Sequence, residues 1–513
     1  MIKTLIKRWL APDAGSHNKA RFGRRREVAA SEHRIDVGLV DKRAIDVVQT
    51  LQEAGYEAYI VGGAVRDLLL GKRPKDFDVA TNATPEQVKR EFRRAFIIGR
   101  RFRIVHVVYG RGRDHEVIEV TTFRAFLDNA DAQQIKGNEK THKRQLENVE
   151  HAVDASGRVL RDNVWGSMEE DAARRDFTIN AMYYDPFTEV VIDYHGGIKD
   201  AQKRVLRMIG DAATRYREDP VRIIRAVRFT AKLAELGFKI EKGTKSPMLS
   251  SLGLLADVPQ SRMFDEMLKL LQTGHALATV NQLKSLGMGK GIYPLLDLAV
   301  ARSEDPLLNQ ALADTDRRVG EDKPVAPSYL LACLLWPDVR QALQGLEADA
   351  RRMPVALAWQ QAVDMAFDAR IGDVSGRGKL GADMREIWLM QPRFERRTPK
   401  STASLLAQPR FRAAFDFLRL RAHAGEVEPE LAAWWEDFSL ADEHSRASML
   451  DVLAREQRRH KGSKRRPAAD DEAQDDDLPA MTSAESSDAP KRRRRRRRKP
   501  AGDRAAGASD SGD

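Results

Sequence analysis

Runs of apolar residues with a strand-like period predict a sheet in the first part of the chain. From about Ile35 to Tyr194, short runs rich in β-branched and aromatic residues are separated by turn residues and short helical stretches. The runs expected to form strands are Tyr59–Val61, Phe77–Ala80, Ile104–Tyr109, Val117–Thr122 and Val190–Tyr194. The sequence therefore predicts a mixed αβ domain in this part of the chain.

Helix-start and helix-stop residues lie between these strands. Ala64–Leu70 is expected to form a short helix that ends at Gly71. Thr84–Gln87 and Ser167–Glu170 have the spacing of a capping box, so each is expected to begin a helix. The polar stretch Asn129–Asn148 has no periodicity and is expected to be a loop.

From Ala201 onward, the apolar positions follow the helical period. Asp219-Pro220 is expected to cap a helix that ends near Gly237. The apolar stripe of this helix consists of Val221, Ile224, Val227 and Ala231. Between about Ser261 and Arg455, helical patterns recur without strand alternation. After Arg455 the apolar content falls, and the acidic block Asp470–Asp477 precedes a basic run that cannot fold alone because its charges repel one another.

These patterns predict an α+β protein with a mixed-sheet head, an all-α neck and body, and a disordered basic tail. The expected parts are a flexible basic N-terminal extension (1–34), the head (35–200), a helical neck (201–260), an all-helical body (261–455) and a disordered charged tail (456–513).

Composition narrows the class of protein. The 513-residue chain has a single cysteine, Cys333, which excludes a disulfide framework and is typical of the reducing cytoplasm. Its apolar runs are too short to span a membrane, so no stable membrane insertion is expected. The net charge of +11 points to a polyanionic partner. The basic, amphipathic segment Met1–Leu10 is interpreted as part of the flexible extension, with weak membrane contact as the alternative.

The candidate chemistry is concentrated in a glycine pair and an acid pair. Gly62 and Gly63 leave a predicted strand and open a predicted helix, where backbone N–H groups can approach an anion. Asp76 and Asp78 flank Phe77, so in a strand both carboxylates project from one face while the aromatic ring enters the core. Two adjacent carboxylates repel each other and favour a bound cation, here Mg²⁺ with Mn²⁺ as the alternative. A phosphate cradle beside such a pair predicts two-metal phosphoryl transfer.

Four motifs together resemble the class II nucleotidyltransferases of the polymerase-β superfamily, which add nucleotides to RNA 3′ ends without a template. The motifs are Gly62–Asp67 (GGAVRD), Lys75–Thr81 (KDFDVAT), Arg174–Asn180 (RRDFTIN) and Glu218–Arg222 (EDPVR). The resemblance implies a polymerase-β-like nucleotidyltransferase head at 35–200, with Asp76 and Asp78 as catalytic metal ligands.

The same resemblance assigns roles to further residues. Gly62, Gly63 and Arg66 are expected to bind phosphate, and Arg175 to contact the ribose and triphosphate of the nucleotide. Asp176 is expected to be the third catalytic acid, with Glu119 on a neighbouring predicted strand as the rival.

The motif EDPVR is implied to read the incoming base. Asp219 and Arg222 are three residues apart, so on a helix they share a face. A carboxylate can accept a hydrogen bond from the N6 amino group of adenine, and a guanidinium can donate to the adjacent ring nitrogen. An ordinary helix-capping acid with an intrahelical ion pair is the alternative interpretation.

Two basic segments favour poly(A) addition within this family. Ile97–Val107 is similar to the block that marks bacterial poly(A) polymerases, and its Arg100, Arg101 and Arg103 are candidate RNA contacts. The C-terminal run, also similar to those enzymes, consists of Lys491, Arg492, Arg493, Arg494, Arg495, Arg496, Arg497, Arg498 and Lys499. Phosphate contacts give affinity without sequence information, which suits an enzyme that acts on many RNA ends.

The sequence thus predicts a cytoplasmic, template-independent RNA adenylyltransferase with ATP and RNA 3′ ends as substrates, in mRNA processing and RNA decay. CCA addition to tRNA is the first alternative, and a non-catalytic RNA-binding protein on the same fold is the second. RNA-decay or RNA-chaperone proteins are candidate partners, and the sequence does not specify an oligomeric state.

Overall fold

A computed structural model describes residues 22–99, 103–110, 115–126, 133–134, 151–153, 159–162, 164–349, 353–370 and 378–463 of the chain. The chain divides after Ala454 into two compact units, and the long helix α23 (Glu443–Ser463) crosses this boundary. None of the described helices combines the length and the apolar character needed to cross a membrane.

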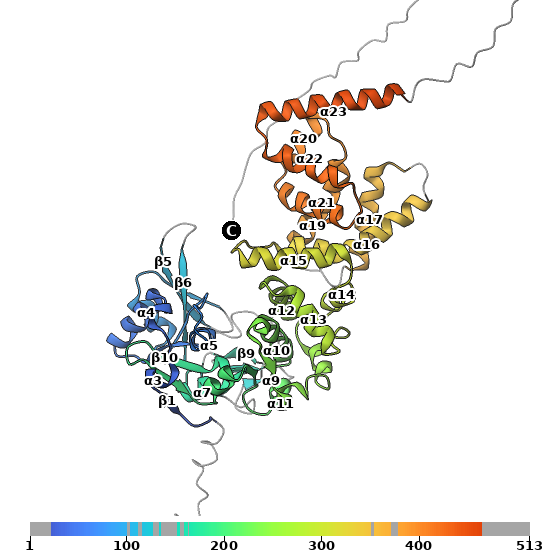
Figure 1. Cartoon of the computed structure of the whole chain (residues 1–513). Helices are drawn as coiled ribbons and strands as arrows, with labels where there is room; N and C mark the ends of the chain where they lie inside the picture. The colour runs from blue at the N-terminus through green and yellow to red at the C-terminus, as the bar shows by residue number, and fades with distance from the viewer. Residues whose placement is uncertain are drawn as a thin grey trace, which may run out of the picture. The chain divides into compact units, whose positions relative to one another are not determined.

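An eight-stranded mixed sheet forms the centre of the head (Figure 1). Its strand order is β1-β11-β10-β2-β3-β6-β5-β4, and within it the β3–β6 pair alone is parallel. The strands are β1 (Arg26–Val28), β2 (Ala58–Val61), β3 (Asp78–Thr81), β4 (Ala95–Ile98), β5 (Ile104–Tyr109), β6 (Glu116–Thr122), β10 (Met182–Asp185) and β11 (Val190–Asp193).

Helices cover the two faces of this sheet unequally. The helices α4 (Lys42–Glu53) and α6 (Pro85–Glu91) pack on one face of β3, β4, β5 and β6 and bury its valines. On the other face, α7 (Met168–Arg174) covers the central strands through Met168 and Ala172. The remaining helical elements of the head are α3 (Ala30–His33), α5 (Gly63–Leu69), α8 (Gly197–Gln202), η1 (Val37–Leu39) and η5 (Thr178–Asn180).

The strands and helix starts predicted for the head are confirmed, with bounds that differ by one or two residues. All five predicted strands form, although β3 begins at Asp78 and not at Phe77. Both capping boxes are present. The Thr84 hydroxyl accepts a hydrogen bond from the backbone N–H of Gln87, and the Gln87 side chain accepts one from the backbone N–H of Thr84. Ser167 and Glu170 make the same pair of hydrogen bonds. These contacts satisfy backbone donors at the helix starts, which is why the four-residue pattern alone identifies them.

The prediction of a flexible extension up to residue 34 is wrong for residues 22–34. Strand β1 pairs antiparallel with β11, and helix α3 follows it before Ile35. Val28 is buried against Val191 in the sheet core, but a strand of three residues in an arginine-rich segment gives almost no periodic signal.

The neck contains two short strands in addition to its helices. Strands β12 (Val205–Leu206) and β13 (Lys239–Ile240) pair in parallel, which the prediction of a purely helical neck missed. The helical elements are α9 (Ala212–Glu218), α10 (Val221–Lys232), α11 (Lys242–Lys245), η6 (Ala234–Leu236) and η7 (Leu252–Asp257). The predicted apolar stripe of α10 is buried as expected: Val221, Ile224, Val227 and Ala231.

The body is helical, as predicted. Its helices are α12 (Gln260–Gln272), α13 (Ala276–Ser285), α14 (Pro294–Ala301), α15 (Pro306–Gly320), α16 (Pro327–Asp349), α17 (Val355–Ala369), α19 (Gly378–Phe394), α20 (Pro399–Leu406), α21 (Phe411–His423), α22 (Pro429–Leu440) and α23 (Figure 1). Helix α23 continues to Ser463, so the predicted start of disorder at residue 456 is wrong by eight residues.

Three predicted segments lie wholly or largely outside the described residues. The acidic block and the basic run Lys491–Lys499 both follow residue 463. Of the expected loop Asn129–Asn148, only Gln133–Gln134 is described, and it forms β7 in a small sheet with β8 (His151–Val153) and β9 (Val159–Asp162).

Candidate active site

The glycine pair forms the turn between β2 and α5. Gly62 has φ +80° and ψ −134°, a conformation that side-chain-bearing residues avoid. A Cβ atom added at Gly62 would lie 3.8 Å from Nη1 of Arg175 and 3.9 Å from Oδ2 of Asp78. The turn therefore brings three of the sequence motifs within contact distance of one another.

The acid pair lies at the start of β3. Phe77 is 5% exposed, whereas Asp76 and Asp78 on either side of it are exposed, which is the predicted alternation. Asp76 precedes the strand, and Asp78 is directly opposite Glu119 in the parallel β3–β6 register. Although the residue as a whole is exposed, the protein packed around its carboxylate removes part of its water. This desolvation and the charge of Glu119 raise the pKa of Asp78 to about 6, with a further contribution from Asp76, while the Arg175 guanidinium opposes the shift.

The two rivals for the third acid have different surroundings. Glu119 neighbours Asp78, and its Oε1 lies 3.3 Å from Nε2 of His106 on β5. Asp176 is instead surrounded by cations of α10. Its Oδ1 accepts a hydrogen bond of 3.0 Å from Nε of Arg222, and its Oδ2 lies 2.8 Å from Nε of Arg225. Of the two acids, Glu119 is thus the one that lies opposite Asp78 in the sheet.

Arg66 links two motifs within the protein. Its side chain is 2% exposed, forms a 2.8 Å ion pair with Asp67, and donates a 2.8 Å hydrogen bond to Oδ1 of Asn180. The buried guanidinium holds the glycine turn to the RRDFTIN segment. This arrangement favours a positioning role over the direct phosphate contact that the sequence predicted.

Arg175 is held at the end of α7 with its guanidinium beside the glycine turn. Its Nη2 pairs with Oδ2 of Asp171 at 3.0 Å, and its guanidinium carbon lies 5.5 Å from the ring centre of Tyr183. Burial favours the neutral form, but the Asp171 carboxylate holds the pKa of Arg175 above its usual value. The site thus contains a fixed positive charge near Gly62.

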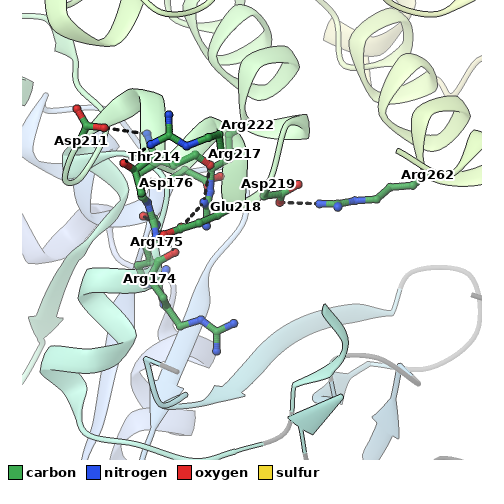
Figure 2. Close-up of polar contacts among 11 residues, drawn as sticks. Arg174, Arg175, Asp176, Asp211, Thr214, Arg217, Glu218, Asp219, Arg222 and Arg262 are labelled. Carbon is green, nitrogen blue, oxygen red and sulfur yellow. Dashed lines mark hydrogen bonds and ion pairs between the residues drawn. The ribbon is translucent and has the colours of Figure 1, made fainter. Parts of the chain in front are cut away.

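The residues expected to read the base are each bound to a different partner (Figure 2). Oδ2 of Asp219 accepts a 2.7 Å hydrogen bond from Nη2 of Arg262 on α12, while Arg222 pairs with Asp176 and Glu218. Burial works against the Asp219 charge, but Arg262 and Arg222 hold the pKa of Asp219 below its usual value.

The predicted capping role of Asp219 is wrong. Asp219 ends α9 and reaches Arg222 through its backbone carbonyl, and α10 follows Pro220 without a side-chain cap. The backbone of Asp219 is extended, with φ −147° and ψ 94°, so Asp219 lies outside α10. The three-residue spacing to Arg222 therefore does not place the two side chains on one helix face.

The predicted RNA contacts are only partly described. Arg103 forms an ion pair with Glu86 at the start of α6. Arg100, Arg101 and Lys491–Lys499 lie outside the described residues, so their roles stay predictions.

Sequence reasoning missed two arginines of this site. Arg225 is one helical turn after Arg222 and shares its face, so the spacing could have indicated it. Arg262 is separated from Asp219 by 43 residues, and only the packing of α12 beside α10 brings the two together.

The acids fit a divalent cation with an incomplete protein shell. Among the described residues, no group of three or more His, Cys, Asp or Glu side chains is close enough to enclose a metal ion. Carboxylate oxygens are nonetheless the ligands that Mg²⁺ prefers, and Mg²⁺ commonly takes its remaining ligands from water and phosphate. The pKa of Asp78 is raised first by desolvation and then by repulsion from Glu119, and a bound cation would counter both effects.

Three family models of known proteins match segments of this chain. Residues 58–207 match the family model "Poly A polymerase head domain", 237–299 match "Probable RNA and SrmB- binding site of polymerase A", and 351–471 match "Polymerase A arginine-rich C-terminus". Poly(A) polymerase I of Haemophilus influenzae is 39% identical over 423 residues, which cover 81% of this chain and 88% of the relative.

Enzymes that add CCA are also similar, over a shorter span or at lower identity. The CCA-adding enzyme of Geobacillus thermodenitrificans is 36% identical over 247 residues, covering 48% of this chain and 53% of the relative. The crystal structure of the Bacillus stearothermophilus CCA-adding enzyme with CTP is 27% identical and covers 82% of this chain and 98% of that chain, with a TM-score of 0.42. The chain is 39% identical to poly(A) polymerase I over most of both sequences, and it therefore belongs to the poly(A) polymerase family.

Proposed function

We propose that this protein transfers AMP from ATP to the 3′-OH of RNA without a template and releases pyrophosphate. The structural observation that supports this proposal is the convergence of Asp78, Glu119, Gly62 and Arg175, which combines neighbouring acids with a glycine turn and a fixed positive charge. The similarity to poly(A) polymerase I over 81% of the chain supports AMP as the transferred group.

Asp76 and Asp78 are the proposed metal ligands. The contacts of Asp176 with Arg222 and Arg225 favour Glu119 as the third acid and give Asp176 a positioning role. When bound there, Mg²⁺ or Mn²⁺ would activate the attacking hydroxyl and neutralise the charge on the triphosphate and the leaving pyrophosphate.

The triphosphate is proposed to lie against the glycine turn. The backbone N–H group of Gly63 can donate to a phosphate oxygen, whereas that of Gly62 donates to the Met182 carbonyl at 3.4 Å. Arg175 supplies a cation that Asp171 keeps in place. Arg66 is proposed to keep the turn in register with Asn180. No covalent intermediate is needed, because positioning and charge neutralisation account for most of the catalysis in phosphoryl transfer.

Asp219 and Arg222 are proposed to select adenine. Oδ1 of Asp219 is buried and receives no hydrogen bond from any described residue, while Oδ2 is bound to Arg262. A buried acceptor without a donor is costly, and the N6 amino group of adenine would satisfy it. Arg222, held by Asp176 and Glu218, is the proposed donor to the ring nitrogen.

The protein is also proposed to bind the RNA backbone and a partner protein. Arg103, Arg100, Arg101 and Lys491–Lys499 are proposed to hold the RNA backbone by charge. The family model matched by residues 237–299 is described as a probable RNA- and SrmB-binding site, which supports RNA and a protein partner at that segment. A cytoplasmic location fits these RNA substrates and the single cysteine.

The product ladder from separate nucleotides tests the activity. With an arbitrary single-stranded RNA and Mg²⁺, we expect long, heterogeneous tails from ATP and little extension from CTP. Short products of defined length that form only on tRNA would instead show CCA addition. Absence of both extension and pyrophosphate release would indicate a non-catalytic RNA-binding protein.

Metal binding can be measured without turnover. Mg²⁺ at saturating concentration is expected to raise the melting temperature of the full-length protein by a few degrees, since a ligand that binds only the folded state stabilises it. The same addition should leave the melting temperature of Asp78→Asn unchanged, because this variant lacks one proposed ligand. Equal shifts in both proteins would contradict the assignment of Asp78 as a ligand.

A further inference from the structure

Four side chains form one row across the strands β3, β6, β5 and β4. Asp78 is opposite Glu119, Glu119 is opposite His106, and His106 is opposite Phe96. Residues that are directly opposite in neighbouring strands project from the same face of a sheet. The row therefore leads from the proposed metal ligands to an aromatic side chain on the last strand of the sheet.

The face that carries this row is open to solvent. Phe96 is 56% exposed, Glu119 and Asp78 are exposed, and His106 is half-buried. The alternate residues Val105, Val107, Ile118 and Val120 point to the opposite face and are buried in the core beneath α4 and α6. Several apolar residues on the same face as the row remain half-buried: Ile98, Ile104, Val108 and Val117.

An exposed cation lies beside Phe96 on the same face of the sheet. Arg94 is two residues before Phe96 and continues the pairing of β4 with β5, whereas Lys89 and Arg90 belong to α6, which packs on the opposite face. An apolar surface with an exposed ring and a neighbouring arginine, in a row that begins at the proposed reaction centre, has the chemistry of a single-stranded nucleic acid site, where bases stack and phosphates pair.

The spacing of the strands relates Phe96 to the reaction centre. Three strand-to-strand steps separate β3 from β4, which is roughly 14 Å. An RNA strand whose terminal 3′-OH lies at Asp78 could cross β6 and β5 and place a base from its last few nucleotides on Phe96. His106 on β5 lies between the two positions, two of the three strand steps from β3, and offers a second ring 3.3 Å from Glu119.

We infer that the open face of β3, β6, β5 and β4 is a binding subsite for the single-stranded 3′ end of the RNA substrate, with Phe96 as a stacking platform for one of its bases. This inference rests on the proposed function, since it takes the row to begin at the reaction centre. Stacking on a ring tolerates every base, which matches an enzyme that must accept many RNA ends.

The test compares Phe96→Ala with Phe187→Ala. Phe187 is a matched control because it is 47% exposed and lies in the turn between β10 and β11, away from the row. Phe96→Ala is expected to weaken binding of a short single-stranded RNA, measured by fluorescence anisotropy without ATP, by roughly 5- to 100-fold. It should raise the KM for RNA similarly and leave the KM for ATP unchanged, and Phe96→Trp should restore both RNA values.

A base analogue then locates the contact. RNA oligomers with 2-aminopurine at each of the last four positions are titrated with wild type and Phe96→Ala, and stacking on Phe96 is expected to quench one position in wild type alone. Wild-type RNA affinity in Phe96→Ala, or an equal loss in Phe187→Ala, would overturn the inference. Because these binding measurements need no turnover, they are independent of the product-ladder test, whose failure would instead reject the proposed function.

Discussion

Asp78→Asn is expected to reduce kcat for AMP incorporation by at least about a thousandfold, because a bound cation supplies several kcal/mol of transition-state stabilisation. The amide keeps the shape of the side chain but loses the negative charge that the proposed metal site requires. The measurement is single-turnover extension of an RNA oligomer with saturating ATP and Mg²⁺, together with RNA affinity by anisotropy. RNA affinity should stay within about twofold, because phosphate contacts by distant cations carry most of it.

The folded state of this variant is expected to be intact. The pKa of Asp78 is raised, so without metal its ionised form is less favourable in the folded state than in the unfolded chain. Removing the charge therefore leaves the melting temperature of the metal-free protein unchanged or higher. Glu57→Gln is the matched control, since Glu57 is an exposed acid at the opposite end of β2 from Gly62. Comparable activity in Asp78→Asn and Glu57→Gln would refute the role of Asp78.

Local interactions explain which parts of the fold were predictable. The strand β5 has the bounds that its β-branched run predicted, and α6 begins at the Thr84 capping box. Both depend on residues within a few positions of one another. Strand β1 was missed because its order comes from pairing with β11, more than 160 residues later in the chain.

The same distinction holds within the active site. The exposed acids around buried Phe77 follow from alternation over three residues. The choice between Asp176 and Glu119 does not, because it depends on the parallel register that puts Glu119 opposite Asp78 and on the packing of α10 that brings Arg222 to Asp176. A motif places residues in order along the chain but does not determine which side chains they meet.

Arg222→Ala is expected to lower kcat/KM for ATP by about a hundredfold and to bring the ATP-to-CTP preference close to one. Hydrogen bonds from a charged group contribute up to roughly 3 kcal/mol, and each 1.36 kcal/mol changes a rate tenfold. In this variant Asp176 still pairs with Arg225, so the Asp176 carboxylate remains neutralised by a cation. The measurement is kcat/KM for ATP and for CTP with the same RNA.

The control for the Arg222→Ala variant is a second arginine-to-alanine substitution in the same part of the chain. Arg217 is suitable because it is exposed on α9 and donates to the hydroxyl of Thr214. Arg217→Ala should keep the wild-type preference for ATP. Arg222→Lys separates charge from geometry: an ammonium preserves the charge but cannot reproduce the planar donors of a guanidinium, so this variant should remain weakly selective. An unchanged ATP-to-CTP ratio in Arg222→Ala would show that the base is read elsewhere, since the lost donor would then have had no part in distinguishing adenine from cytosine.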